Sequence, residues 1–133
     1  MARTASQQPT DGELEILNVL WEEGPRELGA IHAALSQSRK VALTTVATML
    51  NVMLGKGLVT RKKTGRVYVW SARMTRNKAA RGMLEKVIDR VFEGSAHQLV
   101  AHLLENQKLS AAEREQILGL LQSAAARRPG KGE

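Results

Sequence analysis

Residues 42–70 constrain the fold of this chain more than any other stretch. The first half of the stretch places apolar residues at steps of three and four, which predicts a helix with one buried face. The apolar residues of this face are Val46, Met49, Leu50, Met53 and Leu54. The other face carries short, uncharged side chains that both donate and accept hydrogen bonds. These polar residues are Thr44, Thr45, Thr48 and Asn51.

After Gly57 the apolar period changes to two, which predicts a β-hairpin with strands over residues 58–61 and 67–70. The connection between the strands is cationic, and Gly65 within it can take the positive φ of a tight turn. A polar-faced helix followed by a cationic hairpin is the layout of a winged helix-turn-helix, in which the helix enters the DNA major groove. The residues that we expect to contact duplex DNA are Lys40, Thr44, Thr45, Thr48, Lys62, Lys63 and Arg66. The simpler alternative is that the hairpin cations only keep an exposed turn soluble.

The chain before this stretch supplies the rest of a small domain. Thr10 and Glu13 form a capping-box pattern that begins a helix, and Gly24 with Pro25 ends it. A second helix over about residues 28–36 is separated from the third by a short link, as in a helix-turn-helix. We therefore expect a winged-helix domain over residues 10–73, preceded by a disordered arm over residues 1–9.

From residue 74 the pattern predicts three further helices, each strongly apolar on one side. With one Phe and one Tyr in the chain, such short helices could not easily bury this surface as an isolated trio. We therefore predict that residues 74–126 form a homodimer, followed by a basic tail over residues 127–133. An intramolecular bundle packed onto the winged domain is the alternative. The predicted dimer interface consists of Met83, Leu84, Val87, Ile88, Val91, Leu99, Val100, Leu103, Leu104, Ile117 and Leu121.

The charge distribution favours a polyanionic partner. The formal net charge is +7, and residues 61–90 hold ten of the 20 Lys and Arg residues but only two acidic residues. No apolar run approaches the roughly 20 residues that span a bilayer, and the first ten residues lack the apolar core of a signal peptide. We therefore expect a cytoplasmic protein with double-stranded DNA, and no membrane, as its partner.

Other function classes find little support in the residues. The absence of cysteine excludes disulfides, cysteine-ligated metal sites and thiol catalysis. No nucleophile motif or phosphate-binding glycine loop is present, so we expect no enzyme activity and no cofactor. His97 and His102 are five residues apart, unlike chelating pairs at i and i+4, so we expect no metal site. A helical protein-interaction module remains the alternative, and salt-dependent duplex binding would distinguish it from a DNA-binding protein.

The order of several short motifs resembles the penicillinase-repressor family of bacterial transcriptional regulators, the BlaI/MecI/CopY type. The resemblance runs from about Thr10 to Leu121. Its matching motifs are LEILNVLW at residues 14–21, TVATML at 45–50, KGL at 56–58, GRVYVW at 65–70, FEGS at 92–95, LLEN at 103–106 and KLS at 108–110.

The resemblance implies a dimeric repressor with an N-terminal winged helix, a C-terminal dimerisation region and a palindromic operator. It places Thr44, Thr45 and Thr48 at groove-facing positions and Arg66 in the wing. Copper-responsive members carry a C-terminal cysteine cluster, which this chain lacks. β-Lactam-responsive members are cut by a membrane sensor protease, a further candidate partner, and the resemblance places that bond at His102–Leu103, where cut members have Asn–Phe.

Overall fold

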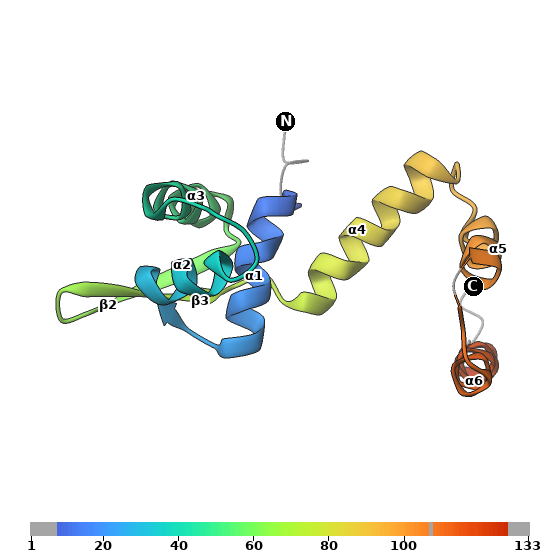
Figure 1. The fold of residues 1–133 in the computed structure, drawn as a ribbon. Coiled ribbons are helices and arrows are strands. Elements are labelled where there is room, and N and C mark those ends of the chain that lie inside the picture. The colour runs from blue at the N-terminus through green and yellow to red at the C-terminus, as the bar shows by residue number, and fades with distance from the viewer. Residues whose placement is uncertain (1–7, 107, 128–133) are drawn as a thin grey trace. The chain divides into compact units, whose positions relative to one another are not determined.

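The computed structural model describes residues 8–106 and 108–127, so the predicted arm and tail lie outside the description except for residues 8, 9 and 127. The chain divides into two compact units between Lys86 and Val87, here called the winged unit (residues 8–86) and the C-terminal unit (residues 87–127). The predicted domain boundary at residue 73 stays a prediction. The elements, drawn in Figure 1, are α1 (Asp11–Glu23), β1 (Arg26–Glu27), α2 (Leu28–Ser36), α3 (Leu43–Lys56), β2 (Val59–Thr64), β3 (Val67–Ala72), α4 (Arg76–Val91), α5 (Ala96–Asn106) and α6 (Ala111–Arg127).

The first helix begins and ends where its capping residues predict. The Thr10 hydroxyl accepts a hydrogen bond from the backbone N–H of Glu13, and the Glu13 carboxylate accepts one from the backbone N–H of Thr10. Gly24 ends the helix with a φ of 84°. The Glu13 carboxylate is buried and also pairs with the Lys56 ammonium at 2.8 Å. One acidic residue thus joins the start of α1 to the end of α3.

Apolar residues from α1, α2, α3 and the sheet meet in one core. The α3 face predicted from its spacing is confirmed, because Val46, Leu50 and Met53 are fully buried. Ile16 and Leu17 of α1 are fully buried as well. The complete core cluster consists of Ile16, Leu17, Leu20, Ile31, Leu35, Val46, Leu50, Met53, Leu58, Val59 and Trp70.

A three-stranded antiparallel sheet with the order β1-β3-β2 completes the winged unit. The strand β1 was not predicted. It has only two residues and no alternating apolar pattern, and it forms through its pairing with Val69 and Trp70 of β3. The indole N–H of Trp21 donates to the Met74 carbonyl at 2.9 Å, which joins α1 to the segment that follows β3.

A histidine holds the link between α2 and α3. The His32 Nε2 atom lies 2.8 Å from the carbonyl oxygen of Val41, and because a carbonyl only accepts, the ring nitrogen donates this hydrogen bond. The contact spans nine residues along the chain. His32 therefore has a structural role in positioning the start of α3.

Serine caps begin both helices that lie wholly in the C-terminal unit. The Ser95 hydroxyl accepts from the backbone N–H of Gln98, and the Ser110 hydroxyl accepts from that of Glu113, each at 3.1 Å. The break before α5 has positive φ values at Glu93 and Gly94. No residue of α5 is buried. None of the helices described is both long and apolar enough to cross a bilayer.

Candidate nucleic-acid interface

The helix α3 presents its polar face to solvent. Thr44, Thr45 and Thr48 are all exposed, as are Asn51 and Val52 further along the helix. The buried side of the same helix anchors it in the core, so these side chains project from a fixed element. Hydroxyl groups can hydrogen-bond to phosphates or base edges, and threonine and valine methyl groups can pack against thymine methyl groups. The three predicted threonines thus share one accessible surface.

The basic residues near this surface differ in whether an acid neutralises them. Arg39 hydrogen-bonds the Glu15 carboxylate at 2.7 Å, which lowers the pKa of Glu15 and raises the pKa of Arg39. Lys56 is paired with Glu13. Lys40, immediately before α3, is exposed and makes no ion pair with any described residue. Among these cations, Lys40 is therefore the one left available to a phosphate.

The hairpin is longer than its sequence pattern indicated. Its register continues to the pair Thr64↔Val67, so Lys62 and Lys63 lie in β2 and not in the connection. Only Gly65 and Arg66 form the turn, and positive φ at Gly65 alone fits a type II′ turn. The period-two apolar pattern did not predict this extension, because residues 62–64 are all polar and therefore show no alternation between apolar and polar side chains. Adjacent strand residues project to opposite faces, so Lys62 and Lys63 point away from each other.

The hairpin cations are nevertheless all accessible. Lys62, Lys63 and Arg66 are exposed, and among the described residues none of them has an acidic partner. The long two-stranded hairpin and the polar face of α3 belong to the same compact unit. The winged unit therefore offers one hydrogen-bonding helix face and a hairpin whose cations Lys62, Lys63 and Arg66 form no ion pair with the residues that the structure describes.

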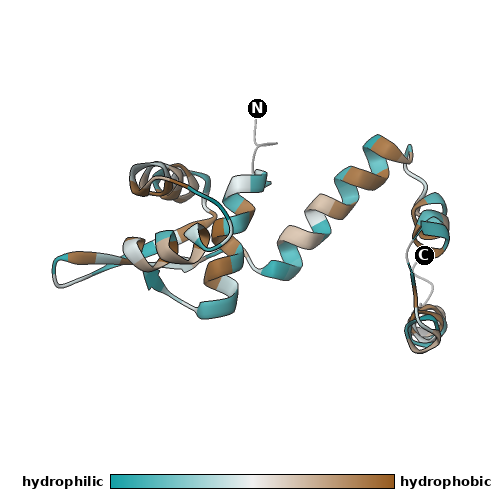
Figure 2. Ribbon diagram, viewed as in Figure 1, coloured by the Kyte–Doolittle hydropathy of each residue, from teal (hydrophilic) through white to brown (hydrophobic). Residues whose placement is uncertain are grey.

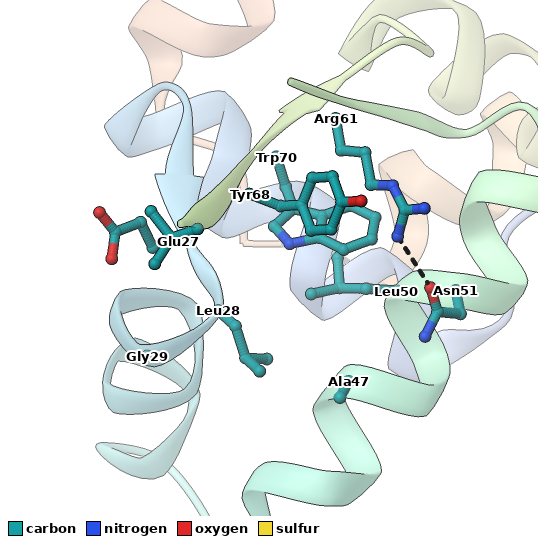
Figure 3. A pocket seen from close by; sticks show the side chains of 10 residues that line it. Glu27, Leu28, Gly29, Ala47, Leu50, Asn51, Arg61, Tyr68 and Trp70 are labelled. Carbon is teal, nitrogen blue, oxygen red and sulfur yellow. Dashed lines mark hydrogen bonds between the residues drawn. The ribbon is translucent and has the colours of Figure 1, made fainter. Parts of the chain in front are cut away.

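A groove of about 400 Å³ lies between α3, the start of α2 and the hairpin. Within it the guanidinium of Arg61 stacks over the Tyr68 ring, 4.0 Å from its centroid, and lies 5.4 Å from the Trp70 ring centroid (Figure 3). The same guanidinium donates to the side-chain oxygen of Asn51 on α3, at 3.4 Å. Sequence reasoning did not include Arg61 among the site residues. The period-two pattern could have placed it on the same face as Trp70, its partner in the register.

Of the remaining candidate residues, Met83 and Leu84 lie on the part of α4 that belongs to the winged unit, and the others lie in the C-terminal unit. The part of the chain that the structure describes contains no group of three or more His, Asp or Glu residues that could hold a metal ion. The His102 ring packs against the Phe92 ring with centroids 5.1 Å apart. The bond between His102 and Leu103 lies within α5, and the His102 carbonyl accepts a hydrogen bond from the Asn106 side chain.

Comparison with known proteins places these features in a family. The model of the family described as penicillinase repressor matches residues 9–123. The penicillinase repressor of Bacillus licheniformis is 26% identical over 115 residues, covering 86% of this chain and 90% of the relative. The complex structure of hsRosR-S4 is similar with a TM-score of 0.55 and 22% identity, covering 93% of this chain and 97% of that chain.

A second complex, of hsRosR-SG, is similar with a TM-score of 0.50 and 19% identity, covering 96% of this chain and 100% of that chain. Because the sequence identities are so low, the similarity to these two structures supports the fold and nothing about function. The fold is a winged helix-turn-helix followed by further helices, as the sequence predicted. Because the family match extends over most of the chain, this protein belongs to the penicillinase repressor family of transcriptional regulators.

Proposed function

We propose that the protein is a dimeric repressor that binds an inverted-repeat operator in double-stranded DNA. The observation that carries the proposal is the combination of an exposed polar face on α3 with exposed cations on the hairpin of the same unit, which form no ion pair within residues 8–106 and 108–127. The helix would read base edges in the major groove, and the hairpin would lie along the backbone. Membership of a repressor family supports repression, and not activation, as the effect of this binding on transcription.

Phosphate contacts would supply most of the affinity. Lys40 directly precedes α3, and Lys62, Lys63 and Arg66 lie in the hairpin that follows it in the chain. Each phosphate that is neutralised releases counterions, which makes binding weaken as salt rises. Threonines provide weaker base discrimination than bidentate side chains do. A second half-site would therefore be needed for a specific operator.

The exposed apolar side chains of the last three helices support a second copy as the partner. Pale brown and brown residues recur along α4, and α5 and α6 each carry them as well (Figure 2). A groove of about 410 Å³ on the C-terminal unit is lined by Leu104, Ile117, Leu118 and Leu121 together with Arg114. The large apolar side chains left exposed on α4, α5 and α6 are Leu84, Val87, Val91, Leu103, Leu104, Leu118, Leu120 and Leu121.

The two copies would set the form of the operator. A two-fold dimer presents two identical reading helices, so its binding site should be an inverted repeat. Helix-turn-helix dimers contact half-sites about 34–36 Å apart, or at a multiple of that spacing. We assign residues 74–126 to dimerisation, including the predicted interface residues on α4, α5 and α6.

Proteolysis by a partner sensor would release the repressor. The proposed bond, His102–Leu103, lies inside the helical hydrogen-bond ladder of α5. A protease acts on such a bond only when the helix opens locally. Because α5 buries none of its residues in one copy of the chain, its local stability should depend on the dimer contacts. Release would then separate the copies and remove the cooperative reading of two half-sites.

Selection of bound duplexes from a random pool tests the function directly. We expect the full chain to enrich an inverted repeat with two equal half-sites and to bind it more tightly than a scrambled duplex of the same composition. Enrichment of no sequence, together with binding that does not respond to salt, would favour a protein-interaction module instead. A single enriched half-site would contradict the dimeric part of the proposal.

The hairpin makes a separate prediction. Replacing both Lys62 and Lys63 by alanine should weaken binding to specific and scrambled duplexes alike. If both side chains neutralise phosphates, the slope of log affinity against log salt should become shallower by about 1.8, at about 0.9 per phosphate. A salt titration of binding to the selected duplex measures this slope. Replacing Lys86 on α4 and Lys108 before α6 by alanine removes the same charge from other segments and should leave the slope unchanged. A slope in the Lys62 and Lys63 variant equal to that of the unaltered protein would exclude the hairpin from the interface.

A further inference from the structure

Asn51 is the side chain on the exposed face of α3 with the strongest capacity to discriminate a base. Its amide carries a donor and an acceptor in a fixed plane, so it can bond to N7 and the N6 amino group of adenine at once. The threonine hydroxyls of the same face cannot make that paired contact. Asn51 lies seven residues after Thr44 and three after Thr48, on the same side of the helix and within the exposed surface.

The orientation of this amide is set by the hairpin. The Arg61 guanidinium has only donors, so the Asn51 atom that faces it at 3.4 Å must be the oxygen Oδ1. An amide oxygen has two acceptor sites and can accept from Arg61 and from an adenine amino group together. The Nδ2 donor is left for adenine N7. One hydrogen bond thus arranges both amide atoms for adenine.

Arg61 is itself restrained. Its guanidinium lies 4.0 Å from the centroid of the Tyr68 ring, and its register partner Trp70 is buried in the core. Stacking on aromatic rings limits the rotamers of a long side chain, and the planar fork then loses little further entropy when it donates. Figure 3 shows Arg61 between the Tyr68 ring, over which its guanidinium stacks, and Asn51, to which it donates a hydrogen bond. The hairpin therefore supports the reading helix through this arginine.

We infer that Asn51 is a specificity-determining residue that reads an adenine in each half-site, and that Arg61 is the positioning residue that orients its amide. The inference rests on the proposed DNA-binding function. It extends that function by naming adenine as the base that Asn51 reads and Arg61 as the residue that orients Asn51. It assigns Arg61 a role in specificity beyond that of a general surface cation.

The test repeats the duplex selection with the full chain carrying Asn51→Ala, Arg61→Lys or Arg61→Ala. In the unaltered protein we expect one adenine per half-site to be preferred roughly 5- to 150-fold over other bases, the range for a good bidentate contact. Asn51→Ala should abolish the preference at that position and keep the preferences elsewhere. Arg61→Lys keeps the charge but loses the planar fork, so it should reduce the same preference without changing the salt slope.

The outcomes separate this inference from the function on which it rests. Failure of the unaltered protein to bind any duplex would contradict the proposed function itself. Retention of every base preference by Asn51→Ala in a protein that still binds would overturn the role of Asn51. A shallower salt slope with all preferences intact in Arg61→Ala would make Arg61 a phosphate contact and overturn its positioning role. Asn18→Ala, at an exposed asparagine of α1, is the matched control and should alter no preference.

Discussion

Replacing Val87 by aspartate is expected to convert the proposed dimer into monomers and to weaken binding to the proposed operator about 10²–10⁴-fold, the usual contribution of a linked second site. Val87 is 40% exposed on α4 and belongs to the apolar stripe that also contains Leu84 and Val91. Burying a carboxylate in an apolar interface without a partner is strongly unfavourable, and two-fold symmetry would introduce that charge twice. Sedimentation equilibrium measures the change in association, and a duplex titration measures the loss of binding.

The matched control for this variant is Lys86→Gln, which makes the same change in charge at the neighbouring position, away from the stripe. It should remain a dimer. Both tryptophans of the chain lie in the winged unit, so their fluorescence should show that this unit stays folded in Val87→Asp. If Val87→Asp sediments as a dimer, the α4 stripe is not the interface that we propose.

The second large effect is expected from Leu50→Ala, which should lower the free energy of unfolding of the winged unit by about 2–5 kcal/mol. Leu50 is fully buried on the inner face of α3, where it packs with residues of α1, α2 and the sheet. Truncating it removes buried apolar surface and leaves a cavity in the core. Urea unfolding followed by tryptophan fluorescence reports on this unit, since Trp21 and Trp70 both lie within it.

A neighbour on the same helix provides the control. Val52→Ala also shortens an aliphatic side chain, but Val52 is 50% exposed, so the change in unfolding free energy should stay within about 0.5 kcal/mol. A similar loss in both variants would mean that α3 is not anchored through its buried face. Comparing the two variants thus tests the packing that holds the threonine face in place.

The periodicity of the sequence was sufficient to locate the helices of the winged unit. The capping residues Thr10 and Gly24 bound α1 as predicted, and α2 covers residues 28–36 as predicted. These signals are local, because a cap needs only side chains within one turn of the helix end. The buried face of α3 followed from spacing for the same reason, since a helix repeats its faces every 3.6 residues.

Local signals did not reveal the features that depend on pairing between distant segments. The strand β1 exists because Arg26 and Glu27 meet β3, more than 40 residues away along the chain. The extension of the hairpin to Thr64↔Val67 is likewise set by backbone pairing, because its side chains there show no alternation. The contact of Arg61 with Asn51 could not be predicted from either segment alone, since it requires the hairpin and α3 to be placed together.

The sequence by itself determined the winged-helix class, the helix that carries Thr44, Thr45 and Thr48, and the cationic character of the hairpin. Those properties reside in short-range spacing and charge, which any conformation of the chain retains. Only the tertiary structure decided which cations are neutralised and which are free: Lys56 pairs with Glu13 from a distant helix, whereas Lys62 and Lys63 meet no acid among the described residues. That distinction depends on three-dimensional proximity, because ion pairs and stacked side chains require contact between segments that sequence spacing alone cannot bring together.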